Sequence, residues 1–213
     1  MQRNKVKQAL NEGKTVVGTM TTEFRNPEVA RVLAAAGFDF LLIDNEHSAY
    51  SLETVNDMIR AAKPTGLVPI VRVPEAEYYL IARRLDIGAQ GVMIPRVETR
   101  ETVELVVRSV KYPPVGARGY GVRAIHTDHE KVSIKEAIDH FNEDTLVVIQ
   151  IENKTAIDHI DELMSVEGVD VGLIGPSDLS ISLGVPGEPN HPRMIEYIEK
   201  HAKAGKTRTK GVG

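Results

Sequence analysis

The sequence predicts an α/β fold, a (β/α)8 barrel of the TIM type that stops before its last β/α unit. Short apolar runs of strand length alternate with segments whose apolar residues recur at helical spacing, as in parallel strands joined by helices. Polar residues follow four of these runs, and a closed barrel would gather them at one mouth, whereas an open sheet would spread them along an edge. The first strand-to-helix turn lacks a Gly-rich phosphate-binding pattern, which counts against a dinucleotide-binding sheet.

Length and composition are consistent with a single domain, 1–213. The chain has no cysteine, which excludes disulfides, thiolate nucleophiles and cysteine-ligated zinc and fits a reducing, cytoplasmic location. The formal charge of -4, without a basic block, argues against nucleic acid as a partner. No apolar run approaches the ~20 residues that a membrane-spanning helix requires, so we expect no membrane partner either.

Six strands are predicted, with the start of a seventh in 206–212; the six lie at 15–20, 38–43, 68–73, 91–95, 146–152 and 169–175. The intervening helices are expected to begin at capping residues such as Asn26, Ser51 and Thr99. The first of these helices should bury Val32 among its apolar residues. An insertion at about 112–143, with a helix near 134–140, separates strands four and five.

An eighth strand cannot be placed before the sequence stops. A (β/α)8 barrel usually takes ~250 residues, and an unclosed barrel leaves strand edges that can pair with another chain. We therefore expect either that the native protein continues past Gly213 or that a neighbouring subunit closes the gap.

Asp44, Glu46 and His47 follow a buried strand, at the position where α/β enzymes place their chemistry. His47 is the only one of seven histidines beside acids at a strand end. A histidine side chain has an unperturbed pKa near ~6.5, which suits a proton carrier, and an adjacent carboxylate would orient it and raise its basicity. The alternative is a loop histidine that is hydrogen-bonded locally.

Glu152 and Asp178 end strands five and six, which are neighbours in such a barrel. Two carboxylates that meet at a barrel mouth suit Mg²⁺ or Mn²⁺, although Glu152 could instead cap the next helix and Asp178 could start a helical turn. Arg72 ends strand three, where its charge suits an enolate oxygen or a substrate carboxylate. A structural ion pair of Arg72 with Asp44 or Glu46 is the alternative.

A Schiff-base mechanism has little support in the sequence. Such a mechanism requires a desolvated lysine in the pocket, and no lysine ends a strand. Lys111 lies past a helix, and Lys154 stands at a helix start, where a solvated role is expected.

Six motifs, in this order, resemble the HpcH/HpaI aldolase family; they lie at 43–47, 71–74, 85–89, 112–119, 150–152 and 175–180. The family consists of metal-dependent (class II) pyruvate aldolases that act on 4-hydroxy-2-oxoheptanedioate, 2-dehydro-3-deoxyglucarate and related 2-oxo acids. The resemblance implies a barrel assembled into homo-hexamers with C-terminal helices exchanged between subunits. This chain departs from the family by ending before the eighth strand, and by residues 124–127 after the Arg-Gly-x-Gly loop, where another arginine is common.

The resemblance also implies roles for particular residues. Glu152 and Asp178 would bind the divalent metal, which would be Mg²⁺ or Mn²⁺, with Co²⁺ as a further possibility. His47 would accept the proton and Asp86 would raise its basicity. The catalytic set is then His47, Arg72 as the transition-state stabiliser, Asp86 and Asp44, and the substrate contacts are Gln150, Ser177, Asp178, Arg72 and Gly175.

The resulting hypothesis is reversible cleavage of a 4-hydroxy-2-oxo acid to pyruvate and an aldehyde. Two alternatives stay open. The first is an acyl-CoA lyase or a phosphoenolpyruvate-type isomerase on the same fold, which would need a basic cluster or Gly-rich cradle that the strand ends lack. The second is a catalytically inactive oligomeric scaffold.

Overall fold

The computed structural model describes residues 1–123, 125–208 and 210–213. Its centre is one parallel sheet in which seven strands pair in sequence order, from β1 to β7. The strands are β1 (Gly18–Thr21), β2 (Phe40–Asp44), β3 (Val68–Arg72), β4 (Gly91–Ile94), β5 (Leu146–Ile151), β6 (Val171–Ile174) and β7 (Gly211–Val212). The predicted strands are therefore present, with ends that differ by a few residues.

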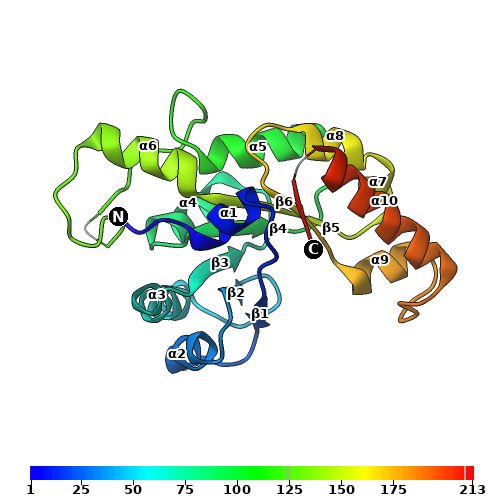
Figure 1. Ribbon diagram of the computed structural model, residues 1–213, viewed down its shortest axis with the longest axis horizontal. Helices are drawn as coiled ribbons and strands as arrows, with labels where there is room; N and C mark the ends of the chain where they lie inside the picture. The colour runs from blue at the N-terminus through cyan, green and yellow to red at the C-terminus, as the bar shows by residue number, and fades with distance from the viewer. Residues whose placement is uncertain (124, 209) are drawn as a thin grey trace.

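Helices connect successive strands and form an arc around the sheet, from α2 through α5 to α10 (Figure 1). They are α1 (Lys5–Asn11), α2 (Glu28–Ala35), α3 (Leu52–Ala62), the short 3₁₀ helix η1 (Lys63–Thr65), α4 (Tyr78–Asp86), α5 (Arg100–Val110), α6 (Ile134–Asp144), α7 (Lys154–Asp158), α8 (Ile160–Ser165), α9 (Pro176–Ser182) and α10 (Pro192–Arg208). No helix in the described part of the chain is both long and apolar enough to cross a membrane.

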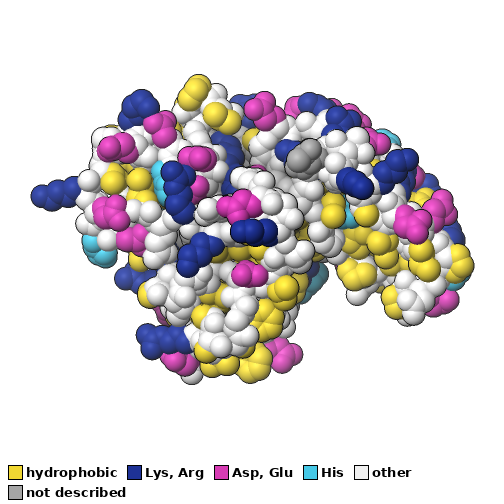
Figure 2. Space-filling model, in the orientation of Figure 1, with side chains coloured by type: hydrophobic (Ala, Val, Ile, Leu, Met, Phe, Trp, Pro, Cys, Tyr) yellow, Lys and Arg dark blue, Asp and Glu magenta, His cyan; other side chains and the backbone are white. Residues whose placement is uncertain are grey.

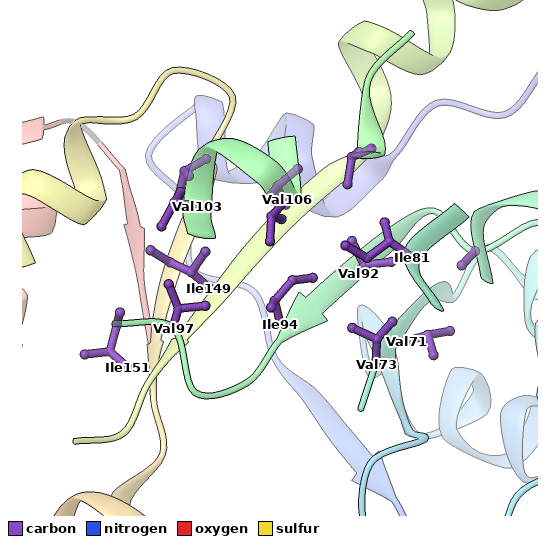
Figure 3. Close-up of a cluster of buried hydrophobic side chains, with 14 of the residues drawn as sticks. Val71, Val73, Ile81, Val92, Ile94, Val97, Val103, Val106, Ile149 and Ile151 are labelled. Carbon is purple, nitrogen blue, oxygen red and sulfur yellow. The ribbon is translucent and has the colours of Figure 1, made fainter. Parts of the chain in front are cut away.

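Both faces of the sheet are apolar. Successive side chains on a strand point to opposite faces, and the strands carry apolar residues at both sets of positions. On the outer face Val92, Ile94 and Ile149 pack against Val103 and Val106 of α5, as Figure 3 shows. The inner face carries a separate cluster, formed by Val6, Leu42, Val68, Ile70, Met93, Leu146, Val148 and Val171. This inner cluster forms an apolar floor inside the curled sheet.

Helix α1 covers part of that floor and was not predicted. Asn4 caps it by accepting a hydrogen bond from the Lys7 N–H, and Val6 is buried in the inner cluster with Leu10 packed against it. Val6 and Leu10 stand four residues apart, so they share one face of the helix. A segment of seven residues is too short for this spacing to stand out in the sequence.

The sheet is curled but does not close into a barrel. Among the described residues, β1 pairs only with β2 and β7 only with β6. The apolar floor continues to Val212 and Gly213, where it borders a cavity of about 100 Å³. In Figure 2, hydrophobic side chains gather along the hollow between the β1 and α2 end of the molecule and the α9 and α10 end. The structure thus supports a half-barrel rather than the full (β/α)8 barrel.

The predicted capping residues behave as expected for α3 and α5, where the Ser51 and Thr99 side chains accept backbone N–H groups of the first turn. The prediction for Val32 was wrong, since this residue is 62% exposed, whereas Ala30 of the same predicted face is buried. In the insertion, α6 begins with a capping box formed by Ser133 and Glu136. These differences leave the order of the strands, and hence the site, unchanged.

Candidate active site

The carboxyl ends of the strands form the mouth of the half-barrel, and the polar side chains there lie on the same inner face as the apolar floor. Asp44 follows Leu42 by two positions and Arg72 follows Ile70 by two, so all four side chains share the inner face. On β5, Gln150 likewise follows Val148 by two positions. The apolar floor therefore lies beneath a ring of polar side chains at the carboxyl ends of the strands.

Asp44 and Arg72 form a buried ion pair at this mouth. They are paired across β2 and β3, and Asp44 accepts hydrogen bonds from Arg72 Nε at 2.9 Å and Nη2 at 2.7 Å. Burial alone would raise the pKa of Asp44, but hydrogen bonds from Arg72 and from the backbone N–H groups of Glu46 and His47 hold it below its usual value. Burial opposes the charge of Arg72, yet the bonds and charge of Asp44 raise the pKa of Arg72. Both groups are therefore ionised.

The remaining nitrogen of Arg72 faces the inside of the mouth. Its Nη1 lies 3.3 Å from Glu46 Oε2 and 3.5 Å from Gln150 Oε1. The ion pair considered as an alternative for Arg72 is thus present, with both Asp44 and Glu46. Asp44 fixes one edge of the guanidinium, and the other edge is directed toward the groups that a substrate would meet.

His47 stands at the edge of the mouth with a side chain that is 63% exposed. Its Nε2 lies 3.7 Å from Glu46 Oε2, and its backbone N–H donates to Asp44 Oδ1 at 3.2 Å. The carboxylate beside His47 is therefore Glu46, which is itself almost fully buried, at 6% exposure. Asp44 acts on the histidine indirectly, through the backbone of its loop.

Glu152 and Asp178 line one pocket of about 290 Å³ together with His47. Its lining residues are Glu46, His47, Arg96, Glu98, Glu152, Asn153, Asp178, Ile181 and Ser182. Burial, with the charges of Asp178 and Glu46, raises the pKa of Glu152, although the hydrogen bond from the Arg96 N–H and the charge of Arg72 oppose this. Glu152 does not cap the next helix, because the Asn153 side chain does so. Asp178 does lie in the first turn of a helix, α9.

A divalent cation fits this donor set. Carboxylate oxygens are the ligands that Mg²⁺ and Mn²⁺ prefer, and a cation would offset the repulsion that raises the pKa of Glu152. Among the described residues no set of three or more His, Asp or Glu side chains is placed to enclose a metal. A cation bound by Glu152 and Asp178 would therefore keep further coordination positions for substrate and water.

Gln150 and Gly175 shape the site around Glu152. Gln150 Nε2 donates to Glu152 Oε2, and a Cβ on Gly175 would lie 2.7 Å from both of these atoms. A glycine is thus required at position 175 because the side chains of Gln150 and Glu152 pass close to its backbone, and not because of a special backbone angle. Ser177 is exposed at the start of α9, next to Asp178, so it stands where a substrate contact is possible.

Among the described residues, no hydrogen bond or ion pair joins Asp86 to His47. It is the last residue of α4, whereas His47 follows β2, and Arg118 Nη2 donates to Asp86 Oδ1 at 2.7 Å. The resemblance implied a role for Asp86 in raising the basicity of His47, and the contacts described here do not supply one. Lys111 is also absent from the described lining of the pocket; its Nζ donates to the Asn142 carbonyl at 2.7 Å.

Arg96 is a residue of the mouth that was not predicted from the sequence. Arg96 follows the end of β4 by two positions, donates from Nη1 to Glu46 Oε1 at 2.9 Å, and donates its backbone N–H to Glu152 Oε1 at 2.6 Å. Its position after a buried strand was the available signal.

Comparison with known proteins gives consistent results. Residues 21–212 match the family model described as HpcH/HpaI aldolase/citrate lyase. The chain is 38% identical over 204 residues to a hydroxypyruvate/pyruvate aldolase of Roseobacter denitrificans, covering 94% of this chain and 77% of that protein. It is 35% identical over 213 residues to a 2-keto-3-deoxy-L-rhamnonate aldolase of Escherichia coli strain K12, covering 99% and 78%.

The fold is also similar to that of a solved structure. The crystal structure of an HpcH/HpaI aldolase from Desulfitobacterium hafniense superposes with a TM-score of 0.94 at 39% sequence identity. The superposition covers 98% of this chain and 80% of that one.

Proposed function

Because the chain belongs to the HpcH/HpaI aldolase/citrate lyase family and is an enzyme of the aldolase type, we propose that it reversibly cleaves a 4-hydroxy-2-oxo acid to pyruvate and an aldehyde. The observation that carries this proposal is the single pocket lined by Glu152, Asp178 and His47, with Arg72 beside it. A retro-aldol reaction requires a base that takes the hydroxyl proton and positive charge that stabilises the enolate, and these residues supply a base, a fixed positive charge and two carboxylates for a cation.

We further propose that Glu152 and Asp178 hold a divalent cation, Mg²⁺ or Mn²⁺. When bound, such a cation supplies Lewis-acid polarisation of the 2-oxo acid, which lowers the free energy of the enolate that forms. Gln150 orients Glu152 by donating to its Oε2, and Gly175 leaves the room that this contact needs.

In the proposed reaction His47 takes the proton from the C4 hydroxyl while the C3–C4 bond breaks. The electron pair of that bond stays on C3 as the pyruvate enolate, and C4 becomes the aldehyde carbon. Arg72 stabilises the negative charge on the enolate oxygen. Its two hydrogen bonds to Asp44 hold the guanidinium in place before the reaction, so it does not need to reorient when the charge forms. Water then protonates C3 to give pyruvate, and the hydroxide that remains takes the proton from His47, which restores the neutral base.

The direct test mixes the protein with pyruvate, an aldehyde such as glycolaldehyde, and Mg²⁺ or Mn²⁺, and follows the loss of pyruvate. We expect turnover that stops with EDTA and returns when metal is added. His47→Gln and Glu152→Gln should lose at least 100-fold in rate. His159→Gln is the matched control, because His159 is an exposed histidine beside an acid in a different part of the fold. Turnover that is unaffected by EDTA would contradict the metal-dependent reaction.

A second candidate is carbon–carbon bond cleavage of a coenzyme A ester, because the family description includes citrate lyase. The charge of the mouth supports it less well. Four of the residues that line the pocket are acids, and Arg96 is the only Lys or Arg among its described lining residues. Nucleotide phosphates require several such cations. Tight binding of a coenzyme A ester without turnover of free 2-oxo acids would reverse this ranking.

The open edges of the sheet lead us to propose that the chain forms a homo-oligomer. Unpaired edge strands are open to pairing with another chain, and β1 and β7 are not joined in the described structure. Size-exclusion chromatography with light scattering tests this, and a monomer at all concentrations would contradict it. The hexamer implied by the family resemblance is the specific expectation.

A further inference from the structure

Arg96 adopts a backbone conformation that non-glycine residues rarely take. Its φ is 53°, in the left-handed region, and it follows β4 by two positions. Residues held in such conformations cluster at functional sites, because the surrounding structure must offset the cost. At Arg96 the conformation has a visible consequence, since the backbone N–H donates to Glu152 Oε1 at 2.6 Å.

The side chain of Arg96 is tied to two neighbouring loops. Its Nη1 donates to Glu46 Oε1 at 2.9 Å, and its Nη2 donates to the Pro74 carbonyl at 2.7 Å. These contacts join the loops after β2 and β3 to the loop after β4. The side chain is nevertheless 53% exposed, so burial in a core does not account for its conformation.

Glu152 is held at both oxygens. The Arg96 N–H binds Oε1, and Gln150 Nε2 binds Oε2. A carboxylate oxygen has two lone pairs, so each oxygen can still bind a cation. Hydrogen bonds of this kind orient metal ligands and have a large influence on metal affinity.

We propose that the backbone N–H of Arg96, presented by the left-handed conformation of this residue, orients Glu152 for binding a divalent cation. Arg96 is then a positioning residue that acts through its backbone. The inference rests on the metal site of the proposed function and adds a group that the family resemblance does not supply. Its distinguishing consequence is that metal affinity depends on the backbone conformation at position 96 more than on the guanidinium.

Variants at position 96 separate the two contributions. Arg96→Gly and Arg96→Asn keep a residue that tolerates positive φ, and therefore keep the N–H in place while removing the guanidinium. Arg96→Val also removes the guanidinium but introduces a β-branched side chain that disfavours positive φ. Arg96→Ala provides a milder disfavouring change if Arg96→Val does not fold.

The measurement is Mn²⁺ binding without substrate, with free Mn²⁺ followed by electron paramagnetic resonance and folding checked by circular dichroism. Arg96→Val should bind Mn²⁺ about 10- to 100-fold more weakly than the wild type, and Arg96→Ala should be weaker than Arg96→Gly. Arg96→Gly and Arg96→Asn should stay within about threefold of the wild type, since the strength of an N–H donor does not depend on the side chain.

Two results would overturn the inference. One is Arg96→Gly binding as weakly as Arg96→Val, which would assign the effect to the guanidinium and Glu46. The other is Arg96→Val, or Arg96→Ala in its place, binding as well as Arg96→Gly. Glu152→Gln shows whether either of these two results reflects an error in the inference about Arg96 or an error in the proposed metal site. If Glu152→Gln binds Mn²⁺ like the wild type, then the proposed metal site is wrong; if it abolishes binding while Arg96→Val has no effect, only the inference about Arg96 is wrong.

Discussion

Removing one partner of the Asp44 and Arg72 pair should destabilise the protein strongly, whereas removing both should cost much less than the sum. Asp44 is fully buried and accepts two hydrogen bonds from Arg72. Loss of one member of a buried ion pair leaves an uncompensated charge and typically costs about 3–5 kcal/mol. We therefore expect that cost for Arg72→Met, which leaves the fully buried Asp44 without its guanidinium partner, and a smaller cost for Asp44→Asn, because Arg72 Nη1 still faces Glu46.

The double variant Asp44→Asn/Arg72→Met should recover about 2–3 kcal/mol relative to the sum of the single changes, since residues in one ion-pair network couple by that order. Urea unfolding followed by circular dichroism measures all four proteins. Arg100→Met is the matched control, because Arg100 pairs with Glu104 on an exposed helix surface, where such pairs contribute about 0.2–1 kcal/mol.

Activity should not follow stability in this series. Both Arg72→Met and the double variant should lose about 10²- to 10³-fold in rate, because neither retains the positive charge that the proposed mechanism places at the enolate oxygen. Additive unfolding free energies, to within about 0.5 kcal/mol, would refute the structural argument. Near-full activity of Arg72→Met would remove Arg72 from the mechanism.

Three further predictions concern groups near and far from the mouth. Burial lowers the pKa of Lys111 to about 7, so between pH 7 and pH 10.5 this lysine binds a proton in the unfolded chain but not in the folded one. The unfolding free energy should therefore rise with pH in this range, by at most about 1.4 kcal/mol per pH unit. Lys111→Met should flatten the rise, as measured by urea titrations at pH 7 and 9. Burial also lowers the pKa of His201 below 6.5, so stability should fall as the pH drops below 6.5, and His201→Gln should lose less of its stability between pH 6.5 and 5 than the wild type. Gly175→Ala would place a Cβ 2.7 Å from Glu152 Oε2 and should weaken Mn²⁺ binding at least 10-fold; unchanged affinity would show that Glu152 is not held as described.

Strand order could be read from the sequence because each buried strand is a local apolar run and each helix has its own spacing. The segments 68–73 and 146–152 are examples, and both form strands in the structure. The open edges were expected as well, because only seven strands could be placed, and in the described residues β1 pairs only with β2 and β7 only with β6. The prediction for Val32 was wrong because an apolar residue at the edge of a helical stripe is buried only where another element covers it. In the structure Val32 stays exposed.

The positions of Asp44, Arg72 and Gln150 at the mouth follow from the two-residue period of a strand, which the sequence displays directly. The pairing of Glu152 with Asp178 needed only the further assumption that successive strands are neighbours. The role of Asp86 came from resemblance alone, without such a geometric reason. In the structure its partner is Arg118 of the insertion, a residue whose position no strand period specifies.

Arg96 illustrates what remains out of reach of pattern analysis. Its guanidinium would attract notice beside acids, but the contact with Glu152 is made by its N–H, a group that nearly every residue possesses. What distinguishes Arg96 is a positive φ, and arginine is a residue from which no sequence rule predicts one. The conformation exists because Glu46, Pro74 and Glu152 hold the residue from three sides, so it is a property of the assembled mouth rather than of the local sequence. If this reasoning is correct, a family member with a glycine or asparagine at this position would retain the contact to the glutamate that corresponds to Glu152, without any arginine.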